Sequence, residues 1–334
     1  MNNLKDRITI YGVAKVANVS LATVSRVINN HPNVNEETRK KVKAVIAKLG
    51  YKPSALAQAL ATNKTTHIGV IIPSANYVYI SNLIYGLTEV AREKGFVISL
   101  FVTSHDVNEA KKMMEKIITS HVDGAIIFDD ALEGEDILKI TSYNVPSIVI
   151  NNKITADRLG CIYFGYEHLL KKIIASLLTR KKNTKTPYFL HIENGGRLLN
   201  RMEKAFFDIN EFLNKKAQII KSDDSYTKTY HFFKNYFRTH KKGYFIAYRD
   251  SLAKAIINAA VENNLKVPDD VEVLSIIGTK YAHIMSPTIS TMHIDMVEVG
   301  NKAIIMLDQL IKQNLKEKQF KFESEYIKRE STID

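Results

Sequence analysis

Apolar residues in the first fifty positions recur at intervals of three and four, which is the spacing of one face of an α-helix. The segment TIYGVAKVANVSLATVSRVIN, at 9–29, contains two such runs separated by a turn at Asn18 and Val19. Ser20 stands where the second run needs an N-cap. The pattern therefore predicts a helix-turn-helix. Its inward positions are Ile10, Val13, Ala14, Ala17, Val24, Val27 and Ile28.

A third helix is predicted from Asn35 to Leu49. Asn35 can cap it, Glu36 and Glu37 suit the positive end of its dipole, and Gly50 follows its last residue. Its buried stripe would be Val42, Val45, Ile46 and Leu49.

The outward face of the second predicted helix has an unusual composition. It combines apolar, hydroxyl, guanidinium and amide groups, which suit base edges and phosphates, whereas a merely solvated helix would carry more Glu and Lys. Those residues are Leu21, Ala22, Ser25, Arg26 and Asn29. The alternative is that the three helices are architectural and bind no DNA.

From residue 67 onward the pattern changes to apolar strands that alternate with helices. Repeated strand-helix units predict parallel, doubly wound sheets. A region of about 270 residues is too long for one core, so two lobes are expected. The predicted strands are 67–73, 96–103, 123–130, 187–193, 218–222, 243–248 and 271–277, and the predicted helices include 80–94, 108–120, 202–213 and 251–264.

Positive charge is concentrated at the N-terminal end of the chain. Residues 1–66 contain 11 Lys plus Arg against 3 Asp plus Glu, so +8 of the net +12 lies there. Such localisation indicates a polyanionic partner. By contrast, the run Arg180 to Lys182 with Lys185 is interpreted as a solvated loop.

Several classes of protein are disfavoured by what the chain lacks. No apolar run approaches the length of a membrane helix and no signal peptide is visible, so a cytoplasmic location is expected. Cys161 is the single cysteine, which excludes a disulfide framework and a cysteine-based zinc site, and it is expected to be buried. No P-loop, GxGxxG, HExxH or GxSxG motif occurs. We therefore expect no enzyme activity, no cofactor and no metal.

The helix-turn-helix segment, together with YKPSALAQALA at 51–61, KTTHIGVIIP at 64–73 and IKREST at 327–332, resembles the LacI/GalR family of bacterial transcription regulators. The resemblance runs nearly to the C-terminus, and the first seventy residues are most similar to the catabolite control proteins of that family. It implies an all-α helix-turn-helix DNA-binding head plus an α/β two-lobed periplasmic-binding-protein-like core with parallel doubly wound sheets. The implied domains are a head at 1–52, a hinge helix and linker at 53–66, and an effector-binding and dimerisation core at 67–334.

The resemblance also implies roles for residues of the head. Leu21, Ala22 and Arg26 match base-reading positions, and Arg26 is expected to pair with a guanine. The positions that hold DNA phosphates in the family are Thr9, Ser20, Thr23, Ser25, Asn29, Asn35 and Thr38.

In the implied hinge, Leu60 matches the leucine that enters the DNA minor groove. Small alanines would let two hinge helices approach closely, and an apolar wedge between base steps kinks a duplex. The alternative is that SALAQALA forms a simple Ala-rich linker helix.

For the core, the resemblance implies a cleft between the lobes that holds a small effector, a sugar or a phosphorylated sugar. The matching residues are Arg201, Asp250, Asn76, Tyr79 and Arg249. Arg201 and Asp250 would face a polyol across the cleft, or would form a structural salt bridge instead. Ile277 and Gly165 replace aspartates that are frequent in the family. Because carboxylates are lost and Arg249 is gained, the pocket is expected to suit a phosphorylated or acidic ligand, or none.

These expectations combine into a homodimeric, sequence-specific DNA-binding repressor of carbohydrate-related genes, with a pseudo-palindromic operator. Two alternatives remain open. One is control by a phosphorylated phosphocarrier protein docked on the helix around 80–92, without a small-molecule effector. The other is a sugar-binding protein that shares the core fold.

Overall fold

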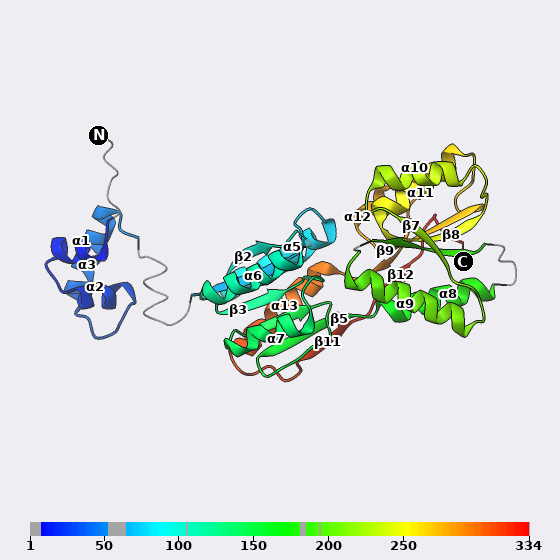
Figure 1. Cartoon of the computed structure of the whole chain (residues 1–334). Coiled ribbons are helices and arrows are strands. Elements are labelled where there is room, and N and C mark those ends of the chain that lie inside the picture. The colour runs from blue at the N-terminus through cyan, green and yellow to red at the C-terminus, as the bar shows by residue number, and fades with distance from the viewer. Residues whose placement is uncertain (1–7, 53–64, 105, 181–184, 194, 334) are drawn as a thin grey trace. The chain divides into compact units, whose positions relative to one another are not determined.

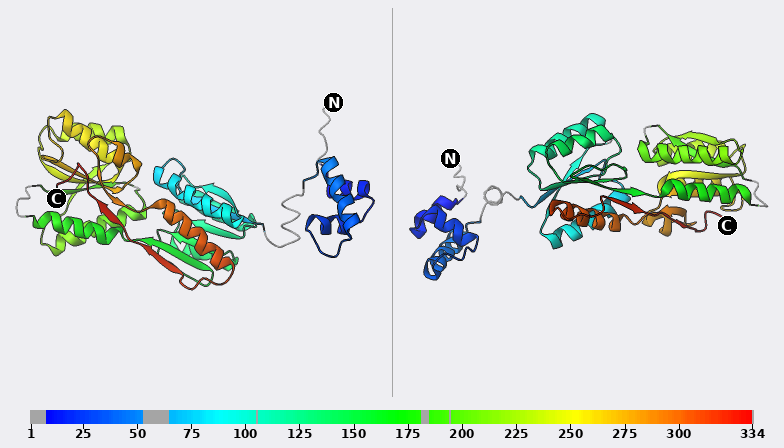
Figure 2. Two further views of the ribbon diagram at one scale, coloured as in Figure 1. Left: turned by 180° about the vertical axis from the view of Figure 1, so that it is seen from behind. Right: turned by 90° about the horizontal axis from the view of Figure 1, so that it is seen from below.

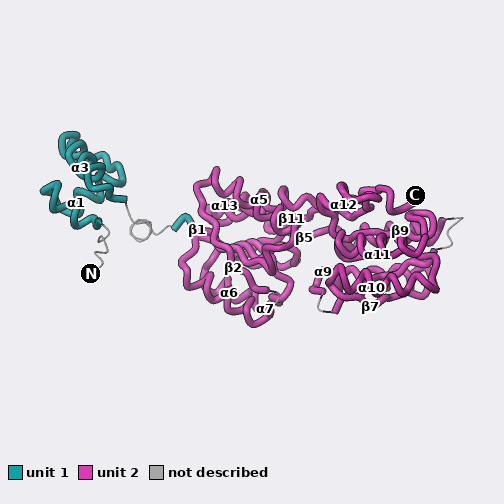
Figure 3. Tube along the Cα trace, turned by 90° about the horizontal axis from the view of Figure 1, so that it is seen from above, with its two compact units in different colours: residues 1–66 teal, residues 67–334 magenta. Residues whose placement is uncertain are grey.

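The computed structural model describes residues 8–52, 65–104, 106–180, 185–193 and 195–333 (Figure 1). The chain divides into two compact units, residues 1–66 and 67–334, which are coloured separately in Figure 3. Each unit is described by itself below. The predicted hinge, including Leu60, lies outside the described residues.

The first unit is a three-helix domain. Its helices are α1 (Ile10–Ala17), α2 (Leu21–Ile28) and α3 (Glu36–Leu49). They enclose a small core in which Val13, Ala17, Val24 and Val42 are 0% exposed. The three predicted helices and their inward positions are therefore confirmed.

Side-chain caps fix where these helices begin. The Thr9 Oγ1 accepts from the Gly12 N–H at 3.4 Å, the Ser20 Oγ from Thr23 at 3.1 Å, and the Asn35 Oδ1 from Glu37 at 2.7 Å. The tight turn after α1 depends on Asn18, whose φ of +51° is left-handed backbone that asparagine tolerates better than most residues.

The second unit contains two six-stranded sheets. In the first the order is β11-β5-β4-β3-β1-β2, and every pair is parallel. In the second the order is β12-β10-β9-β8-β6-β7, with only β12 antiparallel to its neighbour. The strands are β1 (His67–Ile72), β2 (Val97–Val102), β3 (Gly124–Ile127), β4 (Ser147–Ile150), β5 (Leu159–Phe164), β6 (Pro187–Ile192), β7 (Gln218–Ser222), β8 (Gly243–Arg249), β9 (Val271–Ile277), β10 (Ser290–His293), β11 (Gln319–Phe322) and β12 (Glu325–Ile327).

Helices cover both faces of these sheets (Figure 2). Alternate residues of β1 show this directly, because Val70 belongs to one buried apolar cluster and Ile71 to another. The doubly wound arrangement predicted from the sequence is confirmed. The helices are α5 (Val78–Lys94), α6 (Val107–Thr119), α7 (Gly134–Ser142), α8 (Tyr166–Thr179), α9 (Gly196–Phe212), α10 (Tyr226–Tyr236), α11 (Asp250–Glu262), α12 (Lys280–Ile284) and α13 (Met296–Ile311).

The chain passes between the two lobes at three places in the described part. It does so between β5 and α8, between β10 and α13, and between β11 and β12. After the second passage α13 packs against α5, and β11 then pairs with β5. Each lobe is thus built from separate stretches of sequence, which periodicity alone does not reveal.

The α5–α13 crossing requires two glycines. A Cβ on Gly86 would lie 2.1 Å from the carbonyl oxygen of Val297, and a Cβ on Gly300 would lie 2.4 Å from that of Leu83. Backbone atoms cannot yield as a flexible side chain can, so the two helices approach this closely only without side chains there.

The interpretation of Arg180 and Lys185 as parts of a solvated loop is wrong. Glu272, which is 1% exposed, accepts from Lys185 at 3.0 Å and pairs with Arg180 at 3.3 Å. The oxygen that pairs with Arg180, Oε2, also accepts from the Ile333 N–H at 2.7 Å. A buried carboxylate needs such partners, and here they fasten the C-terminal segment to the second lobe.

Cys161 is buried in β5, as expected, and burial raises the pKa of its thiol. Among the described helices, none is long and apolar enough to cross a membrane.

Candidate functional site

Two regions carry candidate chemistry, and the first is the outer face of α2. Leu21, Ala22 and Arg26 are all exposed there, while Val24 and Val27 on the opposite face hold the helix against the domain. The residues assigned to base reading therefore lie on an accessible surface.

Three of the residues assigned to DNA phosphates are helix caps. Thr9, Ser20 and Asn35 accept from their own helices through oxygen. The Thr9 hydroxyl and the Asn35 amide can still donate to another acceptor, as phosphate contacts require, whereas the Ser20 hydroxyl also forms a hydrogen bond with the Thr23 hydroxyl at 2.9 Å. The other members are Thr23, Ser25, Asn29 and Thr38, of which Asn29 is exposed and the rest are half-buried.

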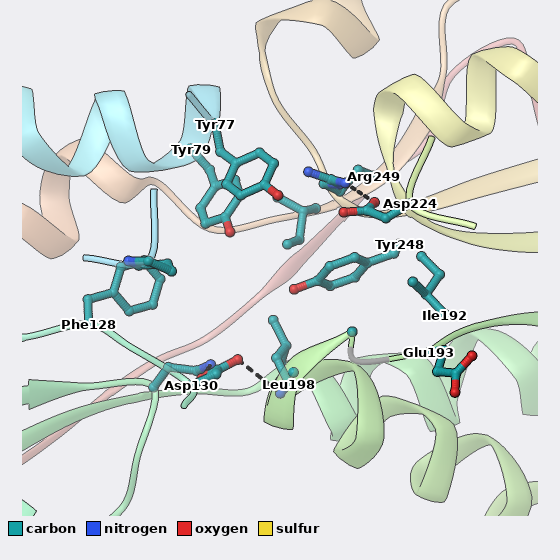
Figure 4. Close-up of a pocket in the computed structure, with 15 residues that line it drawn as sticks. Tyr77, Tyr79, Phe128, Asp130, Ile192, Glu193, Leu198, Asp224, Tyr248 and Arg249 are labelled. Carbon is teal, nitrogen blue, oxygen red and sulfur yellow. Dashed lines mark hydrogen bonds and ion pairs between the residues drawn. The ribbon is translucent and has the colours of Figure 1, made fainter. Parts of the chain in front are cut away.

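The second region is a cavity of about 200 Å³ between the two lobes of the core (Figure 4). One wall comes from segments that follow strands of the first sheet, and the other from the ends of β6, β8 and β9 and the start of α9. Its lining residues are Pro73, Tyr77, Tyr79, Phe128, Asp130, Asn151, Ile192, Glu193, Gly195, Gly196, Leu198, Asp224, Tyr248, Arg249 and Ile277.

Aromatic rings form much of this cavity. The Tyr77 and Tyr79 rings stack with centroids 5.6 Å apart, and Phe128 meets Tyr79 edge-on at 6.3 Å. Tyr248 contributes a further ring from the second lobe, and burial raises the pKa of both Tyr79 and Tyr248. Their hydroxyls therefore stay protonated at neutral pH, when they can donate as well as accept hydrogen bonds.

Arg249 extends from the second lobe to the first-lobe wall of the cavity. Its guanidinium pairs with Asp224 of its own lobe and lies 4.4 Å from the centre of the Tyr77 ring. The Tyr248 ring is 5.9 Å away. The positive charge of Arg249 is thus already matched by a carboxylate and by an aromatic face.

Asp130, at the carboxyl end of the β3 segment, contacts both lobes. One carboxylate oxygen accepts from the Asn151 amide at 3.1 Å, and the other accepts from the Leu198 N–H, at the start of α9, at 3.2 Å. The Arg197 Nε donates to the Asp130 carbonyl oxygen at 3.0 Å. These contacts connect the walls of the cavity directly.

Only some of the effector residues expected from the sequence line the cavity. Tyr79 and Arg249 line the cavity. Asn76 is exposed and is not among the lining residues. Ile277 does line the cavity, so the position that lost an aspartate is an apolar part of its wall.

Arg201 and Asp250 do not pair with each other, so the alternative of a structural Arg–Asp salt bridge is wrong. Arg201 donates to the Asn151 carbonyl and side-chain oxygens, at 3.1 and 2.6 Å, and its Nε lies 2.7 Å from Glu167. Asp250 is 3% exposed and accepts from the backbone and hydroxyl of Thr279, both at 2.7 Å. Burial raises the pKa of Asp250, and neither residue lines the cavity.

Sequence reasoning missed Tyr77, Asp130, Asn151, Asp224 and Tyr248. A signal existed for three of them. Asp130, Asn151 and Tyr248 lie at or just after the carboxyl ends of β3, β4 and β8, where ligands of parallel sheets bind. Among the residues that the structure describes, no group of three or more His, Cys, Asp or Glu is arranged to hold a metal ion.

Comparison with known proteins gives two family matches. Residues 9–54 match the model described as bacterial regulatory proteins, lacI family, and residues 197–332 match the periplasmic binding protein-like domain. Catabolite control protein A of Staphylococcus xylosus is 27% identical over 309 residues, covering 92% of this chain and 93% of that protein. The HTH-type transcriptional regulator pepR1 of Lactobacillus delbrueckii subsp. lactis is 27% identical over 337 residues, covering 99% of each.

The fold is similar to that of a lac repressor dimer solved with its operator and an anti-inducer. The TM-score is 0.83 at 22% identity, and the match covers 98% of this chain and 100% of that one. The relative pepR1 is named as a transcriptional regulator, and the solved structure is that of a repressor bound to its operator.

Proposed function

Because the chain is a LacI-family transcriptional regulator, we propose that it is a homodimeric repressor of carbohydrate-related genes. It binds a pseudo-palindromic operator in the cytoplasm and responds to a small ligand in the inter-lobe cavity. The observation that carries the proposal is the helix-turn-helix, whose packed inner face presents Leu21, Ala22 and Arg26 outward.

Recognition by this surface follows from its chemistry. The guanidinium of Arg26 can pair in a bidentate manner with a guanine, and Leu21 and Ala22 suit a thymine methyl group. The flanking hydroxyl and amide donors, with the +8 charge of residues 1–66, supply contacts to phosphate. Leu60 would add a wedge in the minor groove, and two copies related by a twofold axis would read two half-sites.

The experiment is selection of bound sequences from a random duplex library by the purified full chain, at fixed near-physiological salt. A pseudo-palindromic motif is expected. The Arg26→Ala variant is the matched control, since it should recover a motif that is relaxed at one base pair of each half-site. Recovery of no motif by the wild-type chain at any ligand condition would refute the proposal.

The charge balance of the cavity favours an uncharged ligand over a phosphorylated one. The lining contains three carboxylates, Asp130, Glu193 and Asp224, against one cation, Arg249, so its net charge is −2. Arg249, the gained cation, is already paired with Asp224. Stacked rings and a few polar groups suit the flat face of a sugar, so we propose a neutral sugar as the effector.

A phosphorylated protein corepressor is a second candidate input. The resemblance to the catabolite control proteins favours it, and α5 has an exposed face that includes Asn82 and Tyr85. These two residues stand where the docking helix of that group usually has an acidic and a basic residue, which speaks against it. Operator binding measured with neutral sugars, and separately with a serine-phosphorylated phosphocarrier protein, separates the two inputs. The Tyr85→Ala variant should lose only a response to the protein.

A further inference from the structure

We infer that the Asp130 carboxylate connects the two lobes in the absence of ligand and lowers the affinity of the cavity for anionic ligands. The inference rests on the proposed function, in which this cavity takes the effector. It starts from the contacts of one carboxylate, both oxygens of which are engaged by donors from different lobes.

The second-lobe partner is the start of α9. This helix has seventeen residues, and its first turn contains no acidic residue of its own. The N-terminal N–H groups of a helix carry partial positive charge and attract anions. In this structure the attracted group is the Asp130 carboxylate, which accepts from Leu198 at 3.2 Å (Figure 4).

The backbone at this point is shaped to admit the carboxylate. Gly196 has a φ of +84°, and a Cβ there would lie 3.1 Å from Asp130 Oδ2. A side chain at position 196 would therefore be strained and would crowd the carboxylate as well.

Basic side chains of α9 add to the attraction. Arg197 donates to the Asp130 carbonyl oxygen, and its buried Nη2 has no hydrogen-bond partner in the described structure. Arg201 reaches the same network through Asn151, which is 3% exposed and donates in turn to Asp130. Without the Asp130 side chain, the Leu198 N–H and the Asn151 amide would lose their acceptor beside the unpartnered Arg197 Nη2, and the space left would suit an anion of similar size.

Two consequences follow for the cavity. The lobes are held together by protein groups before any effector enters. A ligand that carries a phosphate or carboxylate would meet the Asp130 charge at the place where the donors converge, and it would have to displace that carboxylate. A neutral ligand meets no such competition.

The test uses inorganic phosphate as the probe and calorimetry on the full chain, with ionic strength held constant by chloride because residues 1–66 are basic. The Asp130→Ala variant should bind phosphate at least about tenfold more tightly than the wild type, since charge-assisted donors are released. The Asp157→Ala variant is the charge-matched control. Its carboxylate is 100% exposed, so phosphate affinity should not change.

A further variant shows where the phosphate binds. In the Asp130→Ala background, Arg197→Gln should remove the gained affinity, whereas phosphate bound to the basic N-terminal residues would be unaffected. Equal phosphate affinity in the wild type and Asp130→Ala, or a gain that survives Arg197→Gln, would overturn the inference.

If Asp130→Ala does not fold, as judged by circular dichroism, Asp130→Asn decides. Asp130→Asn removes the charge but keeps an oxygen for the Leu198 N–H, so a smaller gain in phosphate affinity is expected. The absence of any gain would overturn the inference. No DNA is present in this assay. If the operator selection fails, the result of the phosphate-binding assay is therefore still valid. If Asp130→Ala shows no gain in phosphate affinity, the proposed operator binding is unaffected.

Discussion

Replacing Asp250 with alanine separates a structural role from a ligand-binding one. The sequence matches this residue to an effector-binding aspartate, but the structure buries it at the start of α11, away from the cavity lining. One carboxylate oxygen accepts both the backbone N–H and the hydroxyl of Thr279, each at 2.7 Å. We therefore expect Asp250→Ala to destabilise the core even when no ligand is present.

The magnitude follows from these two bonds. Hydrogen bonds to a charged acceptor contribute about 1.5 to 3 kcal/mol each, and a donor left without a partner costs a similar amount. Burial of the carboxylate opposes this gain, since it raises the pKa of Asp250 from 3.8. The net loss for Asp250→Ala should be about 1 to 3 kcal/mol, which lowers the melting temperature of the core by roughly 2 to 8 °C.

The raised pKa also fixes the sign of the pH dependence. A group whose pKa is higher in the folded state stabilises that state most below its unfolded pKa, and the contribution is lost as pH rises through the folded value. The difference between wild type and Asp250→Ala should therefore shrink as pH rises above 3.8 towards neutrality.

Calorimetry is the suitable assay, because the chain contains no tryptophan to report unfolding by fluorescence. Asp269→Ala is the matched control, as it removes an exposed carboxylate from the same lobe and should change stability by less than about 0.5 kcal/mol. If Asp250→Ala behaves like that control but loses its response to ligand, the structural role is refuted.

Three further substitutions test other parts of the molecule. Gly86→Ala should cost about 1 to 3 kcal/mol of stability because its Cβ meets the Val297 backbone, whereas Gly134→Ala, with its nearest contact at 3.5 Å, should be nearly neutral in the same denaturation assay. Arg26→Ala should reduce discrimination at one base pair per half-site by about 1 to 3 kcal/mol in competition binding, and unchanged preference everywhere would exclude it from base reading. Leu60→Ala should weaken specific binding but keep the salt-dependent nonspecific binding, and equal losses would exclude a wedge.

Most of the fold was accessible from the sequence because its elements follow local rules. The strand predicted at 67–73 is observed as His67–Ile72, and Ser20 and Asn35 cap the helices that they were expected to cap. The prediction was least accurate at α9, which begins at Gly196 and not near Met202. Two glycines in sequence favour a turn, and the contact between the Asp130 carboxylate and the first turn of α9 could not be read from the sequence.

The cavity was harder to predict because its members come from both lobes and from distant parts of the chain. Asp130 and Leu198 are 68 positions apart, and no periodicity connects them. Matching residues to a family placed Tyr79 and Arg249 correctly in the lining, but it could not show that Arg201 bonds to Asn151 or that Asp250 bonds to Thr279. Which partner a polar side chain chooses depends on the packed structure around it.

The same limit explains why the sequence alone indicated a phosphorylated or acidic ligand, or none. Comparison with the family pattern at matched positions showed that Ile277 replaces an aspartate and that Arg249 adds a cation. It did not record Asp224, which neutralises that cation, or Asp130, which brings a carboxylate from the other lobe. An electrostatic preference depends on the paired as well as the unpaired charges, and among the residues that line the cavity the balance is negative. A phosphorylated effector would therefore compete with the Asp130 carboxylate for the donors at the start of α9, and the difference in phosphate affinity between the wild type and Asp130→Ala measures the effect of that carboxylate.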